Sequence, residues 1–286
     1  EKLRLLSTLR REEIDPWLTT REREQTYWAN QDMRWSYNER RYKKLLQYHP
    51  GGLLLYLYGN SGQVEHLFDL FRKVFEAIAE QGVNAEERGY LSGIVRRVDE
   101  QYYTDEWAKC CLLLYKKELL QKPPLCLQRL FFRHPDKMKM FLEENPSRSF
   151  DVENDYYLPE EAYQDKRAFD CWAECLYEEF PEILGYIMGK SCNGKDGAFP
   201  HEFIREFLEK QQNEKLTKAV FYGKFNSRGA RIVQDGRTLY EQAKCYRAQA
   251  RELRLKFPQS AKILLQLAKW MESEAQHDQL EAEIVP

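Results

Sequence analysis

The last third of the chain carries the pattern that most restricts its fold. Between residues 237 and 275, apolar side chains recur every three or four positions, which places them on one face of an α-helix. Pro258 interrupts the pattern, and because proline has no backbone N–H it ends one helix and can begin the next. Small residues such as Ala243 and Ala268 let two helix axes approach closely. We therefore predict a helical hairpin here.

Helical spacing also recurs upstream, as in the apolar stripe from Val64 to Ile78. The 286 residues include only 14 Gly and 11 Pro, too few for the regular turns of an all-β sandwich. The sequence therefore predicts an all-α fold, either an irregular array or a solenoid of helical hairpins. At most one short β element is expected, near 230–233, between two turn-like segments.

Three segments share one arrangement, in which a helix ends at a proline and another apolar helix follows. They are Arg41–His49 before Pro50, Cys126–His134 before Pro135, and Tyr246–Phe257 before Pro258. In this respect the chain resembles the tetratricopeptide and HEAT families of α-helical repeat proteins. A fixed repeat of about 34 or 40 residues is not found, so an irregular array fits equally well. The resemblance implies a surface that binds other proteins, without identifying its residues.

A polar segment at 143–166, which contains Pro146 and Pro159, predicts an irregular connection. It would join an N-terminal helical region, 1–142, to a C-terminal helical region, 167–286, unless the whole chain forms one continuous domain. The chain begins at Glu1 in a run that already has helical spacing. We therefore expect it to be a fragment of a larger protein.

The cysteines and the hydropathy indicate the compartment. The seven cysteines are an odd number and no secretory leader precedes them, so we expect reduced thiols in a cytoplasmic protein. The longest apolar run, Leu53 to Leu57, is too short to cross a bilayer. The sequence therefore predicts no association with a membrane.

One group of residues could in principle bind a metal ion. Cys171 and Cys175 lie one helical turn apart, with Cys192 and His201 downstream. Their spacing differs from that of structural zinc sites, and small core cysteines beside Trp172 explain them better. No glycine-rich phosphate loop is present either. We therefore predict neither a metal nor a cofactor.

Signatures of catalysis are also missing from the sequence, including those of serine hydrolases and zinc proteases. His49 and His134 directly precede prolines at expected helix ends, where an imidazole can cap the last carbonyl groups. No catalytic residue is predicted, and a role other than catalysis is favoured. An enzyme of an unrecognised family, with acidic residues gathered from distant helices, stays open as a second alternative.

The main functional prediction is a protein–protein interaction or scaffold module with an unidentified protein partner. Tyrosine and tryptophan dominate the energetic centres of protein interfaces, and aromatic residues make up 14% of the chain. The predicted partner-binding residues are Trp28, Trp35, Tyr37, Tyr42, Tyr156 and Tyr157.

The first alternative is a helical nucleic-acid-binding protein that uses basic faces at 34–44 and 224–256. Cations next to aromatic rings can follow a single-stranded backbone and stack on its bases. The net charge of −2 argues against this role, because nucleic-acid binders usually carry a positive excess. The predicted basic patch consists of Arg34, Arg40, Arg41, Lys43, Lys44, Arg247, Arg251 and Arg254.

Overall fold

The structure is a computed structural model that describes residues 46–47, 50–227 and 236–284. Within these residues it contains thirteen α-helices, three short 3₁₀ helices and no strand, so the all-α prediction is confirmed. The predicted β element near 230–233 lies outside the described residues. The chain divides into two compact units, a first unit at Glu1–Leu127 and a second unit at Gln128–Pro286.

Among its described residues, the first unit contains four complete helices and the start of α9. The four helices are α5 (Gly51–Gly59), α6 (Val64–Gln81), α7 (Ala85–Asp99) and α8 (Asp105–Lys116). The 3₁₀ helix η2 (Ser61–Gln63) lies between α5 and α6. Helix α9 (Leu125–Arg133) begins just before the division between the units. Asn84 and Glu87 form a reciprocal capping box at the start of α7. Thr104 accepts a hydrogen bond from the Trp107 amide and caps α8, as its position predicts.

Aromatic rings fill the core of the first unit. Trp107 is fully buried, and its ring centroid lies 6.0 Å from that of Phe71 and 5.5 Å from that of Phe75. Its indole N–H donates to the Asp99 carboxylate at 2.8 Å. A buried tryptophan needs such an acceptor, so Asp99 satisfies a polar group that the core would otherwise leave unpaired.

The second unit contains the remaining helices. They are α10 (Pro135–Glu144), α11 (Ser149–Asp155), α12 (Lys166–Tyr177), α13 (Pro181–Gly189), α14 (Glu202–Gln211), α15 (Glu214–Asn226), α16 (Arg237–Leu253) and α17 (Pro258–Ile284), with the 3₁₀ helices η3 (Pro146–Arg148) and η4 (Glu160–Tyr163). The stretch before Phe225, whose sequence fits a helix or a strand, is helical in α15.

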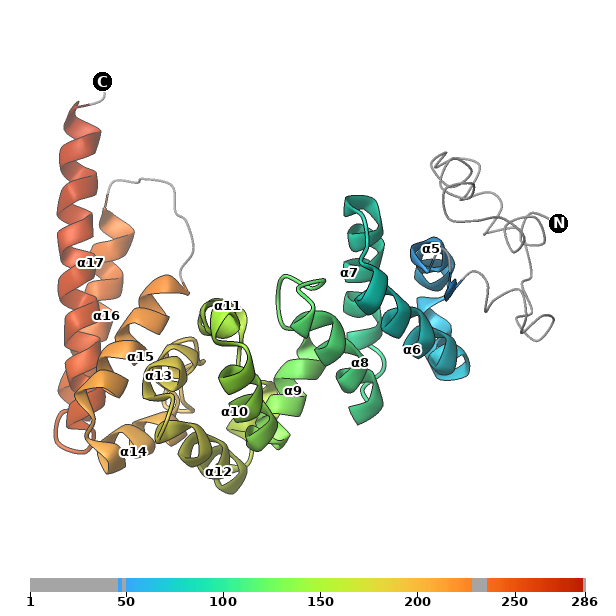
Figure 1. Cartoon of the computed structure of the whole chain (residues 1–286). Coiled ribbons are helices and arrows are strands. Elements are labelled where there is room, and N and C mark those ends of the chain that lie inside the picture. The colour runs from blue at the N-terminus through green and yellow to red at the C-terminus, as the bar shows by residue number, and fades with distance from the viewer. Residues whose placement is uncertain (1–45, 48–49, 228–235, 285–286) are drawn as a thin grey trace. The chain divides into compact units, whose positions relative to one another are not determined.

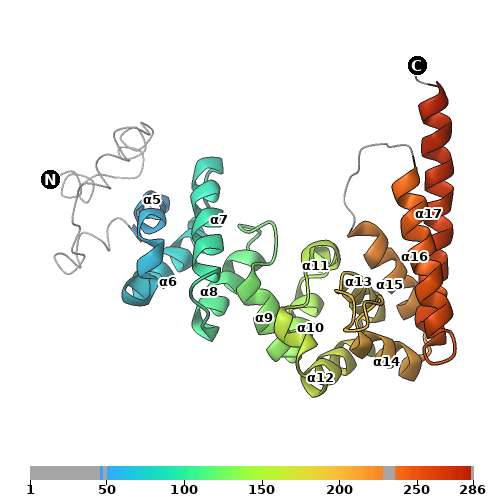
Figure 2. The same ribbon diagram turned by 180° about the vertical axis from the view of Figure 1, so that it is seen from behind.

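The predicted C-terminal hairpin is formed by α16 and α17, which lie side by side in Figure 1 and in the reverse view of Figure 2. Leu239 and Ala243 of α16 belong to one buried cluster with Ala268, Met271 and Ala275 of α17. Pro258 is the first residue of α17, as expected from its fixed φ angle. The periodic stripes therefore pack as the sequence predicts.

Glycines bring α13 and α15 into backbone contact. A Cβ atom added to Gly189 would lie 2.3 Å from the Val220 carbonyl oxygen, and one added to Gly223 would lie 2.2 Å from the Tyr186 carbonyl oxygen. Both separations are shorter than side chains tolerate, so only glycine allows this crossing. The position of α15 is thereby fixed from its α13 side.

The boundary between the units differs from the expected connection at 143–166, because the division falls at Leu127–Gln128. The 143–166 segment belongs to the second unit and contains η3, α11 and η4. Val152, Tyr156 and Ala162 are fully buried there. The segment therefore contains short helices and buried side chains, Arg148 among them, and packs as part of the second unit.

Candidate functional site

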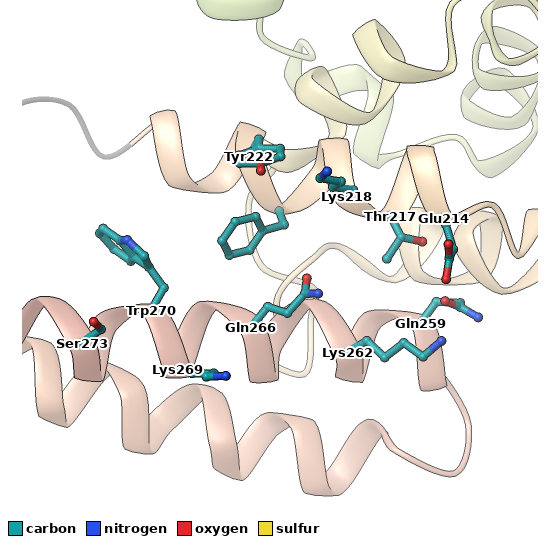
Figure 3. A pocket seen from close by; sticks show the side chains of 11 residues that line it. Glu214, Thr217, Lys218, Tyr222, Gln259, Lys262, Gln266, Lys269, Trp270 and Ser273 are labelled. Atoms are coloured by element: carbon teal, nitrogen blue, oxygen red, sulfur yellow. The ribbon is translucent and has the colours of Figure 1, made fainter.

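A groove in the second unit runs between α15 and α17 and has a volume of about 570 Å³. Figure 3 shows the side chains of the two helices facing each other across it, with Trp270 and Gln266 directed from α17 towards α15. The residues that line it are Glu214, Thr217, Lys218, Phe221 and Tyr222 of α15 and Gln259, Lys262, Gln266, Lys269, Trp270 and Ser273 of α17.

Two capping interactions fix where the walls of the groove begin. The Asn213 side chain accepts from the amides of Lys215 and Leu216, at 2.8 and 3.2 Å, and starts α15. The Glu209 carboxylate accepts from the Gln259 amide at 2.7 Å and from the Ser260 amide at 3.3 Å, which caps α17. Since Glu214 and Gln259 lie at the same end of the groove, the two helices run in the same direction.

Aromatic contacts lie at the opposite end of the groove from Glu214 and Gln259. The ring centroids of Phe225 on α15 and Trp270 on α17 are 4.5 Å apart in an edge-to-face arrangement. The Tyr222 ring stacks on Tyr186 of α13, with centroids 6.4 Å apart and planes 16° apart. From Gln259 to Ser273 the groove follows α17 for about 20 Å, at about 1.5 Å of rise per residue.

The charges along the groove are unequal. Lys218, Lys262 and Lys269 line it, all three exposed, against the single carboxylate of Glu214. Lys218 also lies 5.9 Å from the centre of the Tyr222 ring. Trp270 and Phe221 are only partly buried, so apolar surface remains between the cations. The groove thus combines an apolar lining with a positive rim.

The aromatic residues that the sequence predicts as partner contacts differ in where the structure places them. Trp28, Trp35, Tyr37 and Tyr42 lie outside the described residues. Tyr156 is fully buried and its hydroxyl donates to the Gln128 carbonyl at 2.9 Å, so it is a core residue and cannot contact a partner. Tyr157 is 45% exposed.

Only part of the predicted basic patch lies among the described residues. Its members Arg34, Arg40, Arg41, Lys43 and Lys44 lie outside the described residues.

The remaining members of the patch are on α16. Arg247 makes a two-pronged ion pair with Glu272, at 2.7 and 2.6 Å, so its charge is already matched. Arg251 and Arg254 are exposed. None of these arginines lines the groove, whose three lysines the sequence reasoning missed. Their one trace in the sequence is the helical spacing of Lys262, Gln266 and Lys269 next to Trp270, which ordinary solvated helix faces share.

A half-buried lysine lies elsewhere in the second unit. The Lys190 ammonium donates to the Glu153 carbonyl near the C-terminus of α11, and lies 4.9 Å from the centre of the Tyr157 ring. Burial lowers the pKa of Lys190 to about 7, although Asp155 and Glu153 act in the opposite direction. This amine therefore loses its proton near neutral pH.

A buried arginine holds the loop before α14. Arg205 is 2% exposed, and its guanidinium donates to both oxygens of Asp196, at 2.7 and 2.9 Å. The neighbouring His201 is also buried, and its Nδ1 accepts from the Phe203 amide at 3.3 Å. Burial lowers the pKa of His201. Its side chain caps the N-terminus of α14.

The zinc ligands weighed in the sequence analysis do not come together. Among the described residues, the one group of three or more potential ligands within 4.8 Å consists of Asp99, Cys111 and Cys126. Cys171, Cys175, Cys192 and His201 are not part of such a group. The sequence reasoning missed Asp99 and its two cysteines because they lie on three different helices.

The described helices include none that is both long and apolar enough to cross a membrane. Compared with protein-family models, curated proteins and solved structures, the chain matches none of them. Inferences about its function therefore rest on its own residues.

Proposed function

We propose that this chain is a protein-interaction module whose groove between α15 and α17 binds an acidic amphipathic helix of a partner protein. The observation that carries the proposal is the combination of an apolar, aromatic lining with three lysines and one glutamate. An amphipathic helix binds such a groove through apolar residues at i, i+3, i+4 and i+7, and its flanking residues meet the rim.

The dimensions of the groove suit this ligand. A groove of about 20 Å accommodates between three and four helical turns, at about 5.4 Å per turn. The apolar side chains of the ligand would cover Phe221 and Trp270, which the fold leaves only partly buried. Covering such surface is the main source of affinity in groove binding.

The rim selects the charge of the ligand. With Lys218, Lys262 and Lys269 against Glu214, the local field is positive although the whole chain has a net charge of −2. Glutamates on both flanks of a bound helix would pair with these lysines, whereas lysines there would be repelled. The groove therefore distinguishes acidic from basic helices.

The aromatic geometry favours protein over nucleic acid as the ligand. Single-stranded nucleic acid needs free ring faces for base stacking. Tyr222 already has Tyr186 as a nearly parallel neighbour, with ring centroids 6.4 Å apart, and Phe225 meets Trp270 edge to face. The groove also contains no arginine, the residue that most often contacts phosphate through two hydrogen bonds.

Exposed thiols support the proposed cytoplasmic location. Cys171, Cys192 and Cys245 are free and exposed, which is compatible with a reducing compartment. In this proposal the module acts as part of a scaffold inside the cell.

Fluorescence anisotropy on the purified full chain tests the groove directly. The probe is a labelled synthetic helix with leucines on one face and glutamates on the flanks, and the matched control has lysines in place of the glutamates. We expect the acidic helix to bind and the basic helix to fail. The variant Lys262→Glu/Lys269→Glu should bind the acidic helix about 5- to 30-fold more weakly and gain affinity for the basic one.

A second charge-reversal variant provides the control and tests the nucleic-acid alternative. Arg251→Glu/Arg254→Glu makes the same change in charge on α16, outside the groove, and should leave peptide binding unchanged. A labelled single-stranded oligouridine is tested in parallel at several salt concentrations. Salt-sensitive oligouridine binding that this variant abolishes, with no preference for the acidic helix, would overturn the proposal.

A further inference from the structure

Three potential metal ligands meet in the core of the first unit. Asp99 is the last residue of α7, Cys111 lies on α8 and Cys126 lies in the first turn of α9. One carboxylate oxygen and the two sulfur atoms all lie within 4.8 Å of one another. The three residues are 7%, 0% and 1% exposed, so they form an enclosed site and not a chance group of surface side chains.

The carboxylate is held in place by its own hydrogen bonds. One oxygen of Asp99 accepts from the Trp107 indole at 2.8 Å and the other accepts from the Cys126 amide at 3.2 Å. Trp107 is in turn packed against Phe71 and Phe75. Metal-binding carboxylates are usually oriented by such outer hydrogen bonds, which keep them in position before the ion arrives.

We propose that Asp99, Cys111 and Cys126 bind a structural Zn²⁺ ion that links α7, α8 and α9. Two sulfur donors favour a thiophilic ion over Mg²⁺ or Ca²⁺, which prefer oxygen. In a tetrahedral site with Zn–S bonds of about 2.3 Å, neighbouring donors are about 3.7 Å apart. The present separations therefore need to close by about one ångström at most.

The net charge of the site stays at −1 when the ion binds. Zn²⁺ displaces the two thiol protons, which leave to solvent, and the site then holds two thiolates, one carboxylate and one divalent cation. The single remaining negative charge lies at the N-terminus of α9, where the amides of the helix favour an anion. The second carboxylate oxygen or a water molecule provides the fourth ligand. This proposal is independent of the proposed groove function.

The experiment measures metal content and spectra on the full chain. Protein purified without chelator should contain about one zinc per chain by mass spectrometry of the metal. After removal of zinc, Co²⁺ should restore a thiolate-to-cobalt charge-transfer band in the near ultraviolet. The variant Cys111→Ala/Cys126→Ala should lose both signals, and Cys171→Ala/Cys175→Ala should keep both because its cysteines lie outside the site.

Two further measurements keep the test decisive if the double variant does not fold. In Asp99→Asn, the affinity for zinc should fall at least tenfold, because one ligand is lost. Wild-type protein should show a melting temperature that falls when a chelator is added and recovers with ZnCl₂. Folded, reduced wild-type protein that binds no zinc from ZnCl₂ would overturn the proposal. A Cys111–Cys126 disulfide in protein purified under reducing conditions, seen as a mass lower by two hydrogen atoms, would overturn it as well.

Discussion

The Asp99 site of the first unit and the groove of the second unit place their polar side chains in opposite ways. In the first unit, Asp99 is buried and its carboxylate is matched by the Trp107 indole and the Cys126 amide. In the second unit, Lys218, Lys262 and Lys269 stand exposed around an open groove. A buried polar group contributes to stability because its loss leaves partners without hydrogen bonds, whereas an exposed charge contributes little until a ligand arrives.

This difference separates residues that hold the fold from residues available for binding. Changes in the first set should lower the free energy of unfolding, and changes in the second should alter affinity alone. Arg205 and Lys190 sharpen the comparison because, within the second unit, Arg205 is a buried charge and Lys190 is a half-buried one.

The largest loss of stability is expected for Trp107→Ala. The change removes a fully buried ring from contact with Phe71 and Phe75 and should lower the free energy of unfolding by about 3–5 kcal/mol. Urea denaturation followed by circular dichroism measures this loss. Trp107→Phe keeps most of the ring volume and should cost less, and a loss below about 1 kcal/mol for Trp107→Ala would contradict the described core.

A smaller loss is expected when the buried charge of Arg205 loses its partner. Asp196→Ala removes both hydrogen bonds to the guanidinium and should lower the free energy of unfolding by about 2 kcal/mol. The control is Glu241→Ala, which breaks the exposed pair with Lys244 and should cost less than about 1 kcal/mol. Equal losses in the two variants would show that burial does not distinguish these pairs.

The effect of Lys190 is expected to depend on pH. The pKa of Lys190 is lowered from 10.5 to about 7, so between these values the unfolded chain holds a proton that the folded chain lacks. Stability from this group therefore rises with pH across that window, by at most about 1.4 kcal/mol per pH unit. Below pH 7 both states carry the proton and the slope disappears.

Lys190→Met removes this proton difference. Denaturation of wild type and variant at several pH values between 7 and 9.5 should show a gap in unfolding free energy that shifts in favour of wild type as pH rises. A gap that stays constant would mean that the Lys190 ammonium is not desolvated.

The smallest effect on stability is expected for the groove lysines. Lys262→Glu/Lys269→Glu changes two exposed side chains and should shift the free energy of unfolding by no more than about 0.5 kcal/mol per residue. Thermal unfolding and peptide binding are both measured on this variant. Weakened binding with unchanged stability would show that these lysines act in binding and not in folding. A large destabilisation would place these lysines with the residues that hold the fold.

The sequence predicted the elements far better than the sites. The C-terminal hairpin follows from its apolar period and Pro258, which are local signals. The groove depends on which faces of α15 and α17 remain uncovered, and in sequence Lys262 and Lys269 resemble any solvated helix face. Burial of Tyr156 inside a polar stretch depends likewise on packing that no local pattern reveals.

The group of Asp99, Cys111 and Cys126 likewise could not be predicted from the sequence. Asp99 and Cys126 are 27 positions apart and belong to different helices. No short motif joins them, so the fold alone brings their side chains together. Sequence spacing, as between Cys171 and Cys175, identifies only candidate ligands that lie close together on one helix.

The glycine crossing of α13 and α15 has a consequence for how the groove recognises a ligand. Gly189 and Gly223 let the two backbones touch at this crossing, which leaves no space for α15 to move closer to α13. The wall of the groove that carries Lys218 and Phe221 is therefore preorganised in the free protein. In the proposed complex the ligand would meet this preorganised wall, and its binding energy would go into affinity instead of ordering the receptor.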